Sequence, residues 1–157
     1  MGSSFFLIFG MPSPGAQETQ RIYPYTLGAG AEVNQNTRES TALGYGVALD
    51  RTLGSERFLA GLRGFMDNDY SGISAVEGEF YLRLNLIKLG PGWAFSQLGW
   101  GFVSFREEEN QVQNMLLDFT MGYRLFFLGG FYVEPYIRTG FPVRLGAGIM
   151  AGHWFDF

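Results

Sequence analysis

Charged side chains recur at even spacing in several segments of this sequence, and they are its chemically most informative feature. Glu77 and Glu79 are followed by Arg83, and Glu134 is followed by Arg138. Even spacing places side chains on one face of a β-strand. Arginine and carboxylate groups that meet on such a face form charge-assisted hydrogen bonds. The residues predicted to pair are Arg63, Glu77, Glu79, Arg83, Asp118, Arg124, Glu134 and Arg138.

Other residue types that carry chemistry are scarce. His153 is the only histidine and cysteine is absent, so no thiolate nucleophile, disulfide or Ser–His–Asp set can be assembled. We therefore expect no catalytic residue, no cofactor and no metal site. Asp67, Asn68 and Asp69 offer oxygen ligands for a cation, but an acidic turn explains them better. The three glutamates at 107–109 predict a solvated loop tip, with a bridge to divalent ions or lipopolysaccharide as the alternative.

The composition favours strands over helices. Among 157 residues, 23 are glycine, 17% are aromatic and 17% are charged, a blend that is poor for helices and good for β-structure. No apolar run approaches the roughly 18 residues that a membrane helix needs. A membrane protein of this composition would have to be a β-barrel. The net charge of −4 argues against nucleic acid as a partner.

Alternation of apolar and polar residues predicts eight strands. The clearest runs from 76 to 86, where Phe80, Leu82 and Leu84 oppose Glu79 and Arg83. The segments that alternate in this way are 23–33, 42–50, 57–66, 76–86, 93–105, 117–125, 131–138 and 143–157. Most of them reach the roughly 9–11 residues of a tilted membrane strand. The fold predicted is all-β, an eight-stranded antiparallel up-and-down transmembrane β-barrel.

The predicted connections differ between the two ends of such a barrel. Polar loops are expected at 34–40, 67–72 and 106–114, and tighter glycine-bearing links at 51–56, 88–92 and 127–130. The link at 139–142 is short as well. Long loops at one rim and short turns at the other are typical of outer-membrane barrels.

Periodicity alone does not say which face meets water. Charged residues that share a face with glycine pairs, such as Gly44 and Gly46, favour a narrow polar lumen, where space is scarce and ions must pair. The apolar face carries aromatic residues near the strand ends, as an interfacial girdle does. Those residues are Tyr23, Tyr25, Phe58, Phe155 and Phe157. The alternative is a soluble lipocalin-like barrel that uses the same alternation with its faces reversed.

The two ends of the chain carry their own signals. Residues 1–20 combine an apolar run with a small-residue stretch, as in a secretory signal, but lack a basic start. We therefore assign 1–20 to a signal-like or unstructured segment and 21–157 to the barrel. At the other end, Phe155 and Phe157 lie on one strand face after Gly152.

This ending resembles the assembly signal of outer-membrane barrels, in which a glycine and an aromatic residue precede a terminal Phe. The chain is most similar to the OmpW-type group over 21–157, through Phe-Tyr-Val-Glu-Pro-Tyr-Ile-Arg at 131–138 and the closing strand. The amino-acid sequence of these blocks is similar to that of spirochaete barrels. The resemblance implies location in the outer membrane of a Gram-negative-type (diderm) bacterium, contact with its lipid and recognition by the barrel-insertion machinery. It also implies a conduit for small, hydrophobic molecules, although the lumen predicted here is richer in ions than that group's.

Two functions follow for a membrane barrel. In the first, the ion pairs act as a gate in a narrow, porin-like channel for small solutes. In the second, the same pairs plug the barrel, which then serves as a surface antigen, adhesin or structural protein through its loops. A soluble ligand-binding barrel is the third reading.

Overall fold

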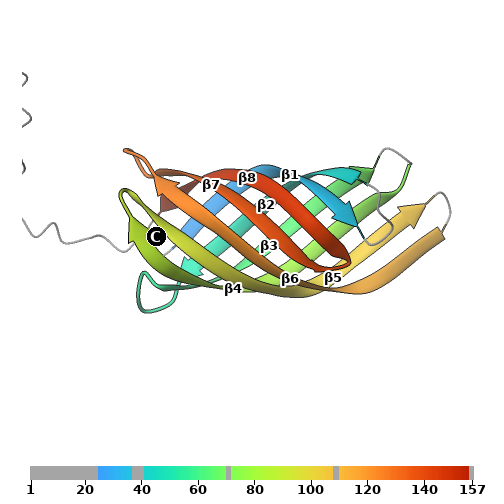
Figure 1. Ribbon diagram of the computed structural model, residues 1–157, viewed down its shortest axis with the longest axis horizontal. Helices are drawn as coiled ribbons and strands as arrows, with labels where there is room; N and C mark the ends of the chain where they lie inside the picture. Colours follow the sequence, from blue (N-terminus) through green and yellow to red (C-terminus); the bar gives the residue numbers. More distant parts are fainter. Residues whose placement is uncertain (1–24, 37–40, 70–71, 108–109, 156–157) are drawn as a thin grey trace, which may run out of the picture.

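The computed structural model describes residues 25–36, 41–69, 72–107 and 110–155. Eight β-strands account for nearly all of them (Figure 1). In chain order these are β1 (Tyr25–Asn36), β2 (Thr41–Thr52), β3 (Phe58–Asp69), β4 (Ser74–Leu89), β5 (Gly92–Glu107), β6 (Asn110–Phe126), β7 (Phe131–Phe141) and β8 (Val143–Phe155). No helix in this part of the chain is long and apolar enough to cross a membrane.

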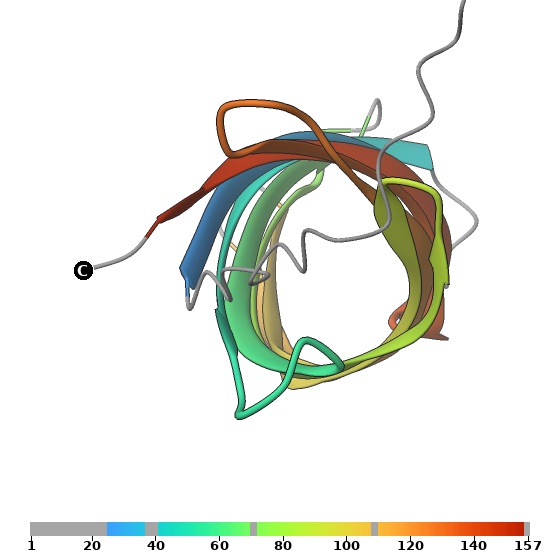
Figure 2. The ribbon, with the colours of Figure 1, turned by 90° about the vertical axis from the view of Figure 1, so that its left-hand side faces the viewer.

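The strands form one closed antiparallel barrel. Each strand pairs with its neighbours in sequence, and β1 pairs with β8 to complete the ring, as the end view shows (Figure 2). The closing register sets Ala29 opposite Ala151 and Tyr25 opposite Phe155. This confirms the predicted fold and leaves no unpaired sheet edge along most of the wall.

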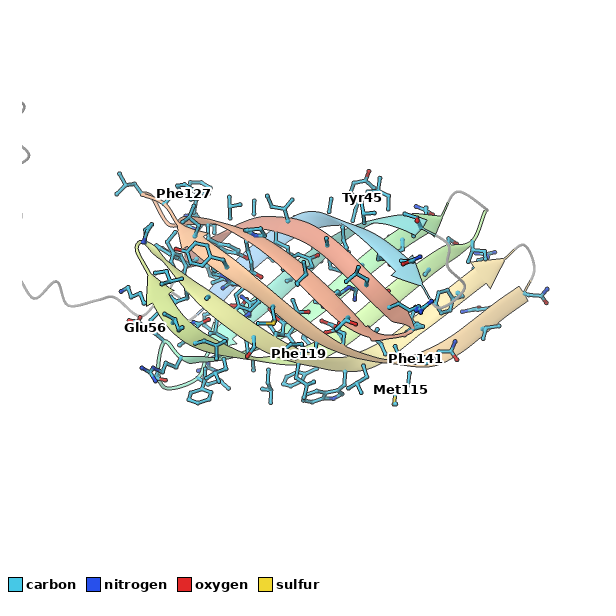
Figure 3. The ribbon with its side chains drawn as sticks, in the orientation of Figure 1. Tyr45, Glu56, Met115, Phe119, Phe127 and Phe141 are labelled. Atoms are coloured by element: carbon cyan, nitrogen blue, oxygen red, sulfur yellow. The ribbon has the colours of Figure 1, made fainter. Side chains whose placement is uncertain are left out.

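Apolar side chains cover the outside of the barrel, and charged ones lie inside. Tyr45, Met115, Phe119 and Phe141 project away from the wall (Figure 3). Large apolar residues with at least a third of their surface exposed occur on every strand. Soluble proteins rarely expose apolar patches of this extent. The soluble lipocalin-like alternative is therefore wrong, because its faces would be reversed.

The two rims of the barrel are defined by their connections. The proximal rim contains the start of β1, the end of β8 and the links at 53–57, 90–91 and 127–130. The distal rim contains the links at 37–40, 70–73 and 108–109 and Pro142. The predicted difference in loop length is wrong, because the distal links are as short as the proximal ones. The expected loop at 106–114 lies mostly in β5 and β6, where Arg106 pairs with Gln111 and Phe105 with Val112.

The start of β8 departs from simple alternation. Opposite β1 the register shifts so that Gln35 faces Leu145 and Asn36 faces Val143. An extra residue at such a bulge reverses the orientation of the side chains before it. Val143 is consequently buried and Arg144 exposed. Simple alternation along 143–157 would place Val143 on the outer face with Leu145, and Arg144 inside.

Glycines make room for tyrosines inside the barrel. A Cβ atom on Gly148 would lie 2.5 Å from Tyr136 Oη, and one on Gly152 would lie 2.6 Å from Tyr132 Oη. No side chain fits at such distances without movement of its neighbour. The predicted scarcity of space around the lumen glycines is confirmed at these positions.

Candidate functional site: the charged lumen

Four charged residues near the proximal rim form what we call the proximal cluster: Asp50, Arg83, Arg124 and Glu134. Glu134 accepts two hydrogen bonds from Arg83, both 2.7 Å long, and one of 2.5 Å from Arg124 Nε. Arg124 also donates to both oxygens of Asp50, at 3.3 and 2.8 Å. Two guanidinium groups and two carboxylates balance, so this cluster is formally neutral.

Neutral side chains complete the hydrogen bonding of the proximal cluster. Tyr81 donates to Asp50 Oδ2 at 3.0 Å, and Gln97 Oε1 accepts from Arg83 at 3.1 and 2.8 Å. The guanidinium of Arg124 lies 4.3 Å from the ring centre of Tyr132. Fork-shaped pairing and stacking of this kind are what arginine supports and lysine does not. The single lysine of the chain, Lys88, lies outside the lumen network, on the exposed end of β4.

A layer of mostly apolar side chains inside the barrel contacts two of the lumen arginines, Arg83 and Arg138. It consists of Ala48, Phe65, Phe95, Tyr136 and Met150, all buried. The guanidinium of Arg83 lies 3.9 Å from the ring centre of Phe95, and that of Arg138 lies 5.6 Å from the ring centre of Phe65. Cation–π attraction of this kind strengthens when water is excluded.

The distal cluster is larger and more acidic. It consists of Glu32, Arg63, Asp67, Glu77, Glu79, Asp118 and Arg138. Arg138 contacts three carboxylates, at 2.7 Å for Glu32, 2.8 Å for Glu77 and 3.3 Å for Asp118. Arg63 contacts Glu79 at 2.6 Å and Asp118 at 2.9 Å. Tyr136 and Asn34 donate to Glu32 at 3.0 and 3.2 Å.

The charged side chains of both clusters are buried, with at most 6% of any residue's surface exposed. Several polar atoms nevertheless lack a hydrogen-bond partner. Among the described residues these are Arg63 Nε, Asp67 Oδ2, Glu79 Oε2 and Gln97 Nε2, while Glu79 Oε1 has only its ion pair with Arg63. Buried polar networks that are only partly satisfied cost stability. The lumen is therefore closed in this structure but incompletely paired.

The eight residues predicted to pair all point into the lumen, and they come from β3, β4, β6 and β7. The structure divides them between two clusters, which the sequence could not show. Glu32 and Asp50 belong to the same network, although the prediction left them out of the pairing set. The apolar Phe65, Phe95 and Met150 were missed because they occupy positions where the pattern expects polar or small residues.

Asp67 was placed wrongly, in an acidic turn. It lies in β3 with 3% of its surface exposed, and its Oδ1 accepts a hydrogen bond of 2.8 Å from Asn34. Asn68, next to it, points outward. The side chains of Asp69 and of 107–109 lie outside the described residues, so the proposed roles of that turn and loop tip are not tested.

The closing strand carries the remaining predicted residues. Gly152 faces Tyr132 inside the barrel, and Phe155 stacks on Tyr25 at 6.1 Å between ring centres. His153 is exposed, packs edge-on against Phe131 at 4.9 Å and lies 3.0 Å from the carbonyl oxygen of Gly129. It is a histidine of the proximal rim. Phe157, Tyr23 and residues 1–20 lie outside the described residues, and the assembly signal remains a prediction.

Solved structures share this architecture at low sequence identity. The N-terminal β-barrel domain of Pseudomonas aeruginosa OprF is 10% identical with a TM-score of 0.61, over 83% of this chain and 97% of that one. Neisserial surface protein A is 9% identical with a TM-score of 0.60, over 85% of this chain and 96% of that one. The chain has the fold of the small outer-membrane β-barrels. A de novo designed transmembrane β-barrel is similar too, with 11% identity and a TM-score of 0.50 over 82% of this chain and 96% of that one.

These likenesses concern the fold alone. No protein-family model matches the chain, and no curated protein matches it. Within the described residues, no three His, Asp or Glu side chains are arranged to hold a metal ion together. What the lumen can do chemically is pair, bind or pass charges.

Proposed function

We propose that this protein is an integral outer-membrane barrel of a Gram-negative-type bacterium and a narrow, porin-like conduit for small molecules. The proximal and distal clusters serve as its gate. The proximal rim, which carries both ends of the barrel, faces the periplasm in this proposal. Outer-membrane lipid surrounds the apolar exterior, and the barrel-insertion machinery assembles it.

One observation carries the proposal. The lumen is closed by ion pairs, although apolar side chains of similar volume would close it at a lower cost in free energy. A buried ion pair is often no more stable than apolar residues of similar volume, because both ions lose their hydration. Here that cost applies to the eleven buried charged residues of the two clusters, and several of their polar atoms have no hydrogen-bond partner among the described residues. In this proposal, the ion pairs of the two clusters exchange partners with water, which lets the lumen open transiently.

The solute class follows from the same lining. Charged groups from both clusters favour ions and small polar molecules over hydrophobic ones. The passage of hydrophobic molecules, which the OmpW-type resemblance implies, would need another route, such as one through the wall. Membership of the OmpW-type group, a spirochaete origin and the absence of enzymatic activity or nucleic-acid binding stay predictions.

A sealed barrel is the second candidate function. It is supported by the complete burial of Arg138 and by hydrogen bonds that link distant strands across the lumen, such as the pair of Arg124 with Asp50. Such a barrel would act as a structural protein, adhesin or surface antigen. One similar fold belongs to a protein named for the neisserial surface.

Single-channel conductance of the refolded full chain in planar bilayers tests the proposal. We expect discrete openings whose selectivity shifts in opposite directions in two variants. Glu134→Gln removes the carboxylate that pairs with Arg83, leaves the proximal cluster with a net positive charge and should favour anions. Arg138→Ala removes the cation that holds three carboxylates and should favour cations.

A compensating variant controls for misfolding. Arg83→Gln combined with Glu134→Gln leaves Arg124 paired with Asp50 and restores neutrality, so its selectivity should return toward that of the native protein. Heat-modifiable migration on gels verifies that each variant is folded. A folded native barrel that never conducts would refute the channel and favour the sealed barrel.

A further inference from the structure

The distal cluster holds more negative charge than its arginines neutralise. Five carboxylates (Glu32, Asp67, Glu77, Glu79 and Asp118) share two guanidinium groups, a formal excess of three negative charges if all are ionised. The proximal cluster is balanced by comparison. Uncompensated charge in a buried site costs several kcal/mol per ion. Among the described residues, the distal half of the lumen therefore lacks the positive charge that would balance its carboxylates.

Asp67 is where this deficit is concentrated. Glu32, Glu77 and Asp118 each contact Arg138, and Glu79 contacts Arg63. Among the described residues, Asp67 is the distal carboxylate with no arginine at ion-pair distance. Its Oδ1 accepts from the neutral amide of Asn34 at 2.8 Å, and its buried Oδ2 has no hydrogen-bond partner in the described part of the chain.

A small cavity opens beside Asp67. Asn34, Asp67 and Glu77 line it on its polar side, and apolar residues that include Phe105 and Val143 form the rest of its wall. Its volume is about 20 Å³, which is room for one water-sized particle. These residues lie near the distal ends of their strands, so the cavity sits at the mouth of the lumen.

We propose that Asp67, with Glu77, binds a monovalent metal cation, potassium or sodium, at the distal mouth. An alkali cation is of about the size of the cavity, and it supplies the charge that the cluster lacks. Only two carboxylates line the cavity, and among the described residues no three acidic side chains are arranged to hold a metal ion together, so the site suits an ion of single charge. The site does not depend on conduction, because a sealed barrel would bind the ion as well.

Unfolding by urea at constant ionic strength tests the site. The full chain is refolded into zwitterionic lipid vesicles with EGTA present, and potassium chloride replaces N-methylglucamine chloride, whose cation is too large for the cavity. A ligand of the folded state raises the folded-to-unfolded ratio by about 100-fold at a hundredfold excess over its Kd. We expect the native protein to show such saturating stabilisation.

Two variants locate the effect. Asp67→Asn keeps the hydrogen-bonding shape and removes the charge, so the potassium dependence should vanish. Asn68→Asp adds a carboxylate on the outward face of the same strand and should leave the dependence intact. Equal stability in both salts would overturn the proposal and assign the missing charge to protons. A potassium dependence that survives in Asp67→Asn would overturn it too.

A direct measurement on the native protein covers the case in which Asp67→Asn does not fold. Crystals of the native chain soaked in rubidium chloride, an anomalous scatterer that replaces potassium, should show a peak beside Asp67 Oδ2. A cavity without rubidium would refute the site.

Discussion

Some lumen positions have room only for glycine, and Gly99 is one of them. A Cβ atom at this position would lie 2.8 Å from Asp118 Oδ1 and 2.8 Å from Glu79 Oε2. Both oxygens belong to the distal cluster, where Arg63 links their carboxylates. The glycine therefore allows two acidic groups and one arginine to share a narrow section of the barrel.

Gly99→Ala should destabilise the barrel by about 1–3 kcal/mol, the usual cost of overpacking. The added methyl group pushes apart carboxylates that Arg63 holds in place. The measurement is the urea unfolding free energy in lipid vesicles. Gly78→Ala is the matched control, because its Cβ would meet only the ring of Phe102, at an ordinary 3.4 Å. A smaller loss for Gly99→Ala than for Gly78→Ala would contradict the observed packing.

At the scale of elements, periodicity predicted the strands well because each one separates lipid from lumen. Period-two alternation then survives along the whole segment, as in β4, where Glu77, Glu79 and Arg83 are buried while Leu82 and Leu84 are exposed. The eight strands follow from that pattern, whereas the inward orientation of the charges was predicted from the glycine pairs that share their face.

The strand ends could not be predicted in the same way. Polar residues at 67–69 and 106–114 have the composition of loops, yet they extend hairpins whose ladder hydrogen bonds outweigh propensity. The bulge before Leu145 leaves no mark in the sequence, and it reversed Val143 and Arg144. The division of the charges into two clusters depends on the stagger between strands, which no single segment encodes.

Closure of β1 on β8 can be tested by cross-linking, since the chain contains no cysteine. Ala29 and Ala151 face each other on the outer surface. With Ala29→Cys and Ala151→Cys together, a short bifunctional thiol reagent should link the two strands in the folded barrel. The linked species is detected by its shifted migration on a denaturing gel.

The off-register pair is the control for that experiment. Ala147 is exposed on the same strand but pairs with Val33, about 13 Å along the ladder from the partner of Ala29. Ala29→Cys with Ala147→Cys should therefore not be linked by the short reagent. Equal linking of both pairs would show that β8 slides along β1, and the closing register would be wrong.

The whole molecule is inverted relative to a soluble barrel, with ions inside and an apolar exterior. In water this arrangement would expose an apolar surface on every strand, whereas in lipid the same surface is the solvated one. The environment therefore decides what a charge on the outer face costs. Leu98 lies mid-way along β5, points outward and neighbours Leu82 and Phe119 on the adjoining strands.

Leu98→Arg should destabilise the barrel by about 2–4 kcal/mol in lipid vesicles, because its charge lies near the bilayer midplane. Leu128→Arg should cost only about 0–1 kcal/mol, since Leu128 is 98% exposed in the link at the proximal rim, where an arginine reaches water. Urea unfolding of both variants in the same vesicles gives the two values. In a barrel whose outer face met water, both substitutions would stay within about 0.5 kcal/mol of the native protein. Equal costs at the two positions would therefore contradict an outer face that meets lipid. They would also contradict the proposed channel, because a channel needs a membrane that separates two compartments.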